Sequence, residues 1–143
     1  MIKILAGGKK SRGFILEGQD EYLKRLKKPF DAQISYIDDA KIADLARNWP
    51  FKPSEYVILL DERGENISSP ELSERLSSAF TSGKQVTIII GGAYGVSDEV
   101  RKRADFVWSV SNLVFPHELM RVLLSEQIYR AQEIYRGSKY NHE

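Results

Sequence analysis

Two charged side chains near the end of the sequence, Glu126 and Arg130, stand four residues apart. In a helix this spacing puts both on one face, where a guanidinium could hold a phosphate or a developing negative charge while the carboxylate orients it. An ordinary ion pair on a helix surface explains the spacing equally well and would contribute only about 0.3–0.5 kcal/mol. The pair is therefore a candidate site that needs support from other residues.

Two further candidates, Tyr140 and His142, lie at the extreme C-terminus, where a purely structural role is least expected of a phenol and an imidazole. Histidine can accept a proton near neutral pH. The other histidine, His117, follows Pro116 in the first turn of an expected helix. A helix N-terminus disfavours the charged imidazolium, so His117 is expected to fix a loop rather than to transfer a proton.

The stretch "IIIGGAYGVS", residues 88–97, runs from three isoleucines into a glycine loop, which is typical of backbone approaching a ligand. A nucleoside triphosphate is a poor candidate, because the loop lacks the Gly-Lys-Ser/Thr that brings a lysine to the phosphates. A dinucleotide fits little better, because the spacing is Gly-Gly-x-x-Gly and follows the fourth expected strand, not the first. Taken alone, the loop is also explained by a plain turn.

Composition narrows the chemistry further. The chain has 143 residues, no cysteine and two histidines, so thiol catalysis and cysteine-type zinc sites are excluded and no metal site is expected. The length suits a single domain spanning residues 1–143. No apolar run approaches the roughly 20 residues of a membrane span, and the first residues do not resemble a signal peptide, so a cytoplasmic location is expected.

Charge is distributed unevenly along the chain although the net charge is only +1. Residues 1–28 carry eight Lys/Arg against three acids, residues 29–99 carry six against twelve, and residues 100–143 carry seven against five. Two basic ends that meet in space could form a face that tracks phosphates. A solvated helix end is the plainer interpretation of "KRLKK".

Strand-like and helix-like segments alternate, which favours an α/β fold with a mostly parallel sheet flanked by helices. Strands are expected at residues 2–6, 32–38, 55–61, 84–90 and 105–110, and helices over 14–28, 40–48, from Ser69 as cap to Gly83, from Ser97 onward, and from Pro116 to Gly137. In such sheets ligands bind beyond the carboxyl ends of the strands. The loops "LLDERG", "IIGGAYG" and "VSNLVFPH" are therefore expected to share a site.

The last helix is too apolar for a single buried face. Between Leu119 and Leu124 five of six residues are apolar. This pattern predicts burial on two sides, with a symmetric homodimer as the simplest source of the second surface. A monomer in which the helix is fully central is the alternative.

The order and spacing of "LLDERG", "IIIGGAYG" and "SVSNLVFPHELMRVLLSEQIYRA", followed by a closing tyrosine and histidine, resemble the RlmH (YbeA) family of SPOUT-class methyltransferases. The likeness extends over nearly the whole chain. It implies an α/β fold whose C-terminal segment forms a trefoil knot, a homodimer, and S-adenosyl-L-methionine as methyl donor without a metal. The implied reaction is methylation of N3 of a pseudouridine in the 23S RNA of the large ribosomal subunit, with the assembled ribosome as substrate.

The resemblance also assigns residues. It implies cofactor contacts by Leu60, Gly91, Val110, Ser111, Asn112, Leu113, Val114 and Phe115, and catalytic roles for Arg130, Glu126, Tyr140 and His142. Asn112 and Val114 stand where family members often have lysine and threonine. Asn141 separates the tyrosine from the histidine, and Glu143 stands in place of a basic residue. Two other functions stay open: a non-catalytic RNA-binding module of the same fold, and a methyltransferase acting on tRNA.

Overall fold

A computed structural model describes residues 1–142, and Glu143 lies outside the described part. Five strands form one sheet in the order β2-β1-β4-β3-β5, and every pairing is parallel. Their bounds are Ile2–Gly7 for β1, Ala32–Ile37 for β2, Glu55–Glu65 for β3, Gln85–Ile90 for β4 and Phe106–Trp108 for β5. The α/β prediction is confirmed, whereas the C-terminal knot stays a prediction.

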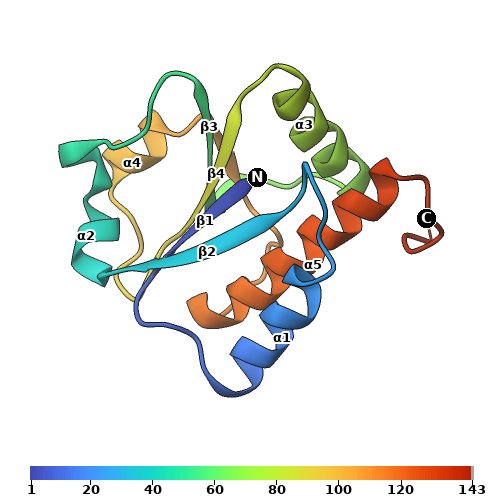
Figure 1. The fold of residues 1–143 in the computed structure, drawn as a ribbon. Coiled ribbons are helices and arrows are strands. Elements are labelled where there is room, and N and C mark those ends of the chain that lie inside the picture. Colours follow the sequence, from blue (N-terminus) through green and yellow to red (C-terminus); the bar gives the residue numbers. More distant parts are fainter. Residues whose placement is uncertain (143) are drawn as a thin grey trace.

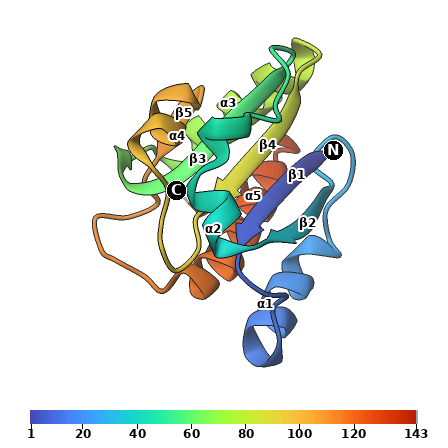
Figure 2. The ribbon, with the colours of Figure 1, turned by 90° about the vertical axis from the view of Figure 1, so that its left-hand side faces the viewer.

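Helices cover both faces of the sheet (Figure 1). Their bounds are Gly13–Leu23 for α1, Asp39–Ala43 for α2, Ser69–Thr81 for α3, Asp98–Arg103 for α4 and His117–Tyr135 for α5, with a 3-10 helix, η1, at Leu45–Asn48. The helices α1, α3 and α5 lie on one side, and α2 and α4 lie on the other, which faces the viewer in Figure 2. No helix within residues 1–142 is both long and apolar enough to cross a membrane.

The central strands are apolar on both faces because each face packs on helices. Ile88 and Ile90 of β4 belong to the core beneath α3 and α5, and Ile89 points into a second core formed with α2 and α4. All three isoleucines are at most 3% exposed. Burial of such a side chain stabilises the fold by about 1.5–3 kcal/mol. These strands therefore hold the loops at their carboxyl ends in fixed positions.

The first helix is shorter than its sequence pattern predicts. It ends at Leu23, not at residue 28. The chain continues in tighter turns, in which the Arg25 N–H donates to the Tyr22 carbonyl at 3.0 Å and the Leu26 N–H donates to the Leu23 carbonyl at 3.2 Å. Pro29 disfavours helical geometry at the residue before it, so the turn has to be completed upstream.

Four other boundaries differ from expectation. The helix expected over 40–48 is split into α2 and η1. Ser68, not Ser69, caps α3, because its hydroxyl accepts the Glu71 N–H at 3.2 Å. The strand β3 runs on to Glu65, where the register with β5 shifts, and β5 is only three residues long. Polar residues in "DERGE" hide the extension of β3 from a hydrophobicity pattern.

The helix α5 is indeed covered on two sides. One side packs on the sheet and α3, and another packs on α1 of the same chain, where a Cβ at Gly18 would lie 3.0 Å from Val122 Cγ1. Part of the second surface is thus supplied within the chain. Leu119 and Leu123 remain half-exposed, and the homodimer stays a prediction.

Candidate functional site

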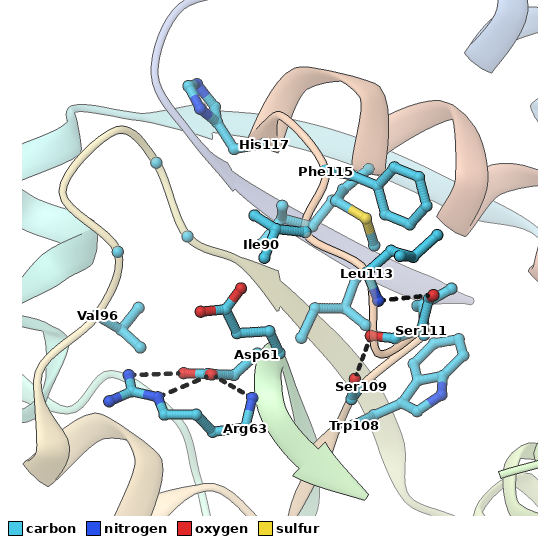
Figure 3. Close-up of a pocket in the computed structure, with 18 of the residues that line it drawn as sticks. Asp61, Arg63, Ile90, Val96, Trp108, Ser109, Ser111, Leu113, Phe115 and His117 are labelled. Carbon is cyan, nitrogen blue, oxygen red and sulfur yellow. Dashed lines mark hydrogen bonds and ion pairs between the residues drawn. The ribbon is translucent and has the colours of Figure 1, made fainter. Parts of the chain in front are cut away.

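A pocket of about 280 Å³ opens beyond the carboxyl ends of β3, β4 and β5. It is lined by residues from the three loops named above and by the start of α5 (Figure 3). Its lining residues are Leu60, Asp61, Glu62, Arg63, Ile90, Gly91, Gly92, Tyr94, Gly95, Val96, Trp108, Ser109, Val110, Ser111, Leu113, Val114, Phe115, His117 and Met120. The expectation that the three loops meet is therefore correct.

Of the eight residues expected to contact the cofactor, seven line this pocket. The exception is Asn112, which is exposed and is not among the lining residues. Its neighbours Leu113 and Val114 line the pocket while remaining 69% and 77% exposed. Apolar side chains this exposed are available to a ligand or to another protein surface.

The close approach of Asp39 and Gly7 explains one of the paired glycines. A Cβ at Gly92 would lie 1.8 Å from Asp39 Oδ1, and a Cβ at Gly7 would lie 2.5 Å from the Gly92 nitrogen. The Asp39 carboxylate also accepts the Ala93 N–H at 3.2 Å, which ties the loop after β4 to α2. Gly91 is different, because a Cβ there would make only ordinary contacts, at 3.4 Å from Gly95. A steric requirement thus accounts for Gly92, whereas a Cβ at Gly91, a lining residue of the pocket, would be tolerated.

Serine side chains shape the loop after β5. Ser111 Oγ accepts the Leu113 N–H at 3.0 Å, and Ser109 Oγ donates to the Ser111 carbonyl at 2.8 Å. The Asn66 amide donates to the Ser109 carbonyl at 2.8 Å and ties the loop to the residues after β3. These bonds fix the peptide groups of the loop along the pocket wall.

An ionised carboxylate that the sequence analysis did not single out lies on the opposite wall of the pocket. Asp61 accepts the Arg63 N–H at 2.9 Å and the Arg63 guanidinium at 3.2 Å, and Arg101 Nε lies 3.4 Å away. Burial alone would raise the pKa of Asp61, but the bonds from Arg63 and the charges of Arg63 and Arg101 outweigh it and lower that pKa. Figure 3 shows this pair across the pocket from Ser111 and Leu113.

Several other lining residues were also missed by the sequence analysis: Glu62, Tyr94, Gly95, Val96 and Met120. All of them except Met120 belong to the loops after β3 and β4, which were expected to line the site. Their position in these loops could therefore have identified them. His117 lines the pocket at the start of α5, with Nε2 3.8 Å from where a Cβ at Gly8 would lie. Its expected role in fixing a loop stays a prediction.

Three of the four C-terminal candidates form a different cluster, toward the C-terminal end of α5. Arg130 pairs with Glu126 at 2.8 Å, and Tyr140 donates a hydrogen bond of 2.8 Å to the same carboxylate. The Arg130 guanidinium lies 4.8 Å from the centre of the Tyr140 ring and donates to Asn141 Oδ1 at 3.0 Å. His142 is exposed. Glu126, Arg130 and Tyr140 are thus brought together, with Asn141 as an additional member.

One chain does not bring this cluster to the pocket. Arg130 stands thirteen positions after His117, at the pocket, and at 1.5 Å per residue of helix this corresponds to about 20 Å. In Figure 1 the C-terminal segment lies beyond the far end of α5 from its N-terminus. Any chemistry that uses both groups of residues therefore needs a second chain or a large substrate that spans them.

Tyr140 is a hydrogen-bond donor, not a base, at neutral pH. Burial and the hydrogen bond to the Glu126 carboxylate raise its pKa from 10.0 to about 12. A phenol whose pKa is raised by folding stabilises the native state below its unfolded pKa, and this contribution is lost as the pH rises through the folded pKa. We expect the loss of unfolding free energy caused by Tyr140→Phe to be constant below pH 10 and to shrink between pH 10 and 12. Urea titrations of both proteins at several pH values would measure this difference, and a pH-independent difference would contradict the assignment.

A parallel α/β sheet with its pocket beyond the carboxyl ends of the strands is the architecture of a ligand-binding α/β protein. Residues 1–142 match the family described as "Predicted SPOUT methyltransferase". The chain therefore belongs to the SPOUT methyltransferase family.

Named relatives agree with this family. A protein of Desulfitobacterium hafniense named "Ribosomal RNA large subunit methyltransferase H" is 44% identical, with 98% of each chain covered. A protein of the same name from Caldicellulosiruptor bescii is 39% identical, with 99% of each chain covered. Among solved structures, a probable methylase family protein from Haemophilus influenzae superposes with a TM-score of 0.56 at 12% identity, over 99% of this chain and 70% of that one. At this identity the superposition supports the fold alone.

Proposed function

We propose that this chain transfers a methyl group from S-adenosyl-L-methionine to N3 of a pseudouridine in the 23S RNA of the large ribosomal subunit, and that it works in the cytoplasm as a homodimer. The observation that carries the proposal is the pocket at the carboxyl ends of β3, β4 and β5, in a chain whose close relatives bear the name of a large-subunit RNA methyltransferase.

The pocket suits the proposed methyl donor. Apolar walls from Leu60, Val110 and Phe115 can enclose an adenine, and the fixed peptide groups of the loop after β5 can pair with its polar edge. Asp61, ionised on the opposite wall, can face the positively charged part of the donor. Gly91 lines the pocket without a side chain of its own, which would let the donor approach the backbone closely. No group of three or more His, Asp or Glu side chains in the described chain could hold a metal ion.

S-adenosyl-L-methionine supplies an already activated methyl group when bound. The task of the protein is then to align the acceptor nitrogen with that group and to exclude water. N3 of pseudouridine is an imide nitrogen, so its proton must leave before or during attack. His142 or solvent can accept this proton, because Tyr140 with a pKa of about 12 already donates to Glu126.

Arg130 is the residue best suited to the negative charge that spreads over the carbonyls flanking N3. Glu126 and Asn141 hold its guanidinium from two directions, and the Tyr140 ring lies against it. Because Arg130 is about 20 Å along α5 from the pocket of its own chain, we place it at the pocket of the partner in the homodimer.

The proposal is tested by incubating the protein with labelled S-adenosyl-L-methionine and large ribosomal subunits or whole ribosomes that lack the modification. Label at N3 of one pseudouridine in 23S RNA is the expected result. Label on tRNA would identify the alternative substrate, and donor binding without transfer to either would contradict the proposed reaction. Absence of donor binding would favour a non-catalytic RNA-binding module.

A further inference from the structure

The loop between β1 and α1, residues 8–12, carries three cations in four positions. Lys9, Lys10 and Arg12 are all exposed, and within residues 1–142 none of them forms an ion pair. The intervening Ser11 is buried, at 4% exposure. The loop therefore directs its hydroxyl inward and presents its charges to solvent, without neutralising them.

A buried arginine holds this loop from beneath. Arg121 of α5 is 1% exposed and donates hydrogen bonds to the carbonyls of Gly7 and Lys9, at 2.8 and 2.9 Å, and to Ser11 Oγ at 2.8 Å. Ser11 in turn donates to Gln19 at 2.9 Å. No carboxylate in the described chain pairs with Arg121. Arg121 thus holds the end of β1, the Lys9 carbonyl and the Ser11 hydroxyl, which anchors the backbone that carries the three exposed cations.

The start of α1 adds to the positive character of the loop. Its N-terminus has no side-chain cap and no acidic residue in the first turn, so the positive end of the helix dipole is not offset there. Two acids are near, Glu17, which is exposed on the second turn, and Asp39, which lies next to Gly8 and accepts the Ala93 N–H. The three exposed cations outnumber these two acids at the loop.

The loop also lies beside the pocket. Gly8 is in contact range of both Arg121 and His117: a Cβ at Gly8 would lie 3.3 Å from the Arg121 guanidinium and 3.8 Å from His117 Nε2. His117 is a lining residue of the pocket. None of the three exposed cations lines the pocket itself. A molecule whose reacting part enters the pocket could therefore lie across this loop.

We propose that residues 8–12, held by Arg121, form a contact surface for the phosphate backbone of the RNA whose base is methylated. The inference rests on the proposed function and adds to it a surface that binds the RNA substrate outside the pocket. Phosphate contacts of this kind position an RNA without reading its sequence, and each makes binding more sensitive to salt. A contact surface that is already ordered before the RNA binds lowers the entropic cost of binding.

The test compares a loop variant, Lys9→Gln/Lys10→Gln/Arg12→Gln, with a control of equal charge change, Lys52→Gln/Lys84→Gln/Lys102→Gln. The control cations are also exposed: Lys52 and Lys84 precede β3 and β4, at the amino ends of the strands and opposite the pocket, and Lys102 lies on α4. Binding to unmodified large subunits is measured as a function of salt concentration. In the loop variant we expect the slope of log K against log salt to fall by about two, at roughly 0.7–0.9 per phosphate contact. The control slope should change far less.

Two further measurements separate the outcomes. S-adenosyl-L-methionine affinity should be unchanged in both variants, and the charge-preserving variant Lys9→Arg/Lys10→Arg/Arg12→Lys should bind like the parent. If the parent transfers methyl groups but the loop variant and the control have the same salt slope, this inference is wrong while the proposed function stands. If the parent neither transfers nor binds, the proposed function fails and the loop assignment fails with it.

Discussion

Replacing Arg130 by methionine is expected to lower the methyl-transfer rate at least about 100-fold, because loss of one positioned donor for transition-state charge typically has an effect of this size. Methionine keeps an unbranched side chain on α5 and against the Tyr140 ring, so the helix should fold normally. The affinity for S-adenosyl-L-methionine should be unchanged, because Arg130 is not a lining residue of the pocket. Single-turnover transfer and equilibrium binding of the donor measure the two quantities separately.

A mixing experiment then asks whether the site is shared between two chains. Gly91→Val should block the pocket, because Gly91 lines it and the added isopropyl group would take up part of its volume. Each variant alone should be inactive. In a mixed dimer, however, the intact pocket of the Arg130→Met chain meets the intact Arg130 of the Gly91→Val chain. Random exchange between equal amounts should restore about a quarter of the parental activity, because about half of the dimers are mixed and each has one complete site.

The control for this experiment is each variant re-mixed with itself, which should stay inactive. Formation of the mixed dimer can be followed with a mass tag on one of the two chains. If mixed dimers form and no activity returns, Arg130 does not act at the pocket of a partner chain. Activity of Arg130→Met alone at the parental rate would instead remove Arg130 from the reaction.

Local patterns in the sequence are enough to predict the fold class and the loops that form the pocket. Apolar runs such as residues 88–90 can be assigned to a doubly covered strand because both of their faces are apolar. The meeting of the three loops follows from the rule that ligands bind beyond the carboxyl ends of parallel strands. Asp61 and Arg63 could also have been predicted as pocket residues. They are charged residues of "DERG", in a loop that was already expected to line the site.

Contacts between distant segments are what the sequence could not supply. Gly92 is required by Asp39, more than fifty residues away, and no local pattern points to that approach. The exposure of Asn112 depends on the serine bonds that shape its loop. The separation of Arg130 from the pocket depends on the straight course of α5, which similarity to a family does not reveal. The partner surface of α5 was expected to come from a second chain, whereas α1 supplies part of it.

Arg121 was the residue least predictable from the sequence. A charged residue within an apolar stretch of a helix is normally expected at the exposed edge of the apolar face. Its burial at 1% exposure is instead explained by its hydrogen bonds to three oxygens, one at the end of β1 and two in the β1–α1 loop. The Tyr36 ring lies 5.0 Å from the guanidinium and adds a further favourable contact. One guanidinium nitrogen, Nε, is buried without a partner in the described chain. The hydrogen bonds of Arg121 therefore stabilise the fold, whereas the desolvation of its charge destabilises it.

Replacing Arg121 by methionine tests which of these effects is larger. The substitution removes the Arg121 bonds to two carbonyls, each at a cost of about 1–3 kcal/mol if left unpaired, and one of the bonds of Ser11, which keeps its bond to Gln19; it also removes a buried charge. We expect a net loss of about 2–4 kcal/mol in the free energy of unfolding, measured by urea titration. Faster hydrogen exchange of the amides of residues 8–12 should accompany it, because the loop loses its anchor.

Two further variants serve as controls for this prediction. Arg121→Lys keeps the charge but not the forked donor geometry, so it should be intermediate in stability and in loop exchange. Arg136→Met removes an exposed arginine just after the C-terminal end of the same helix, whose pairing with Glu133 at 3.5 Å should contribute less than about 1 kcal/mol. Parental stability of Arg121→Met would mean that desolvation cancels the three hydrogen bonds. In that case the arginine is retained for what the loop does rather than for the fold, and the salt dependence of RNA binding should change where the unfolding free energy does not.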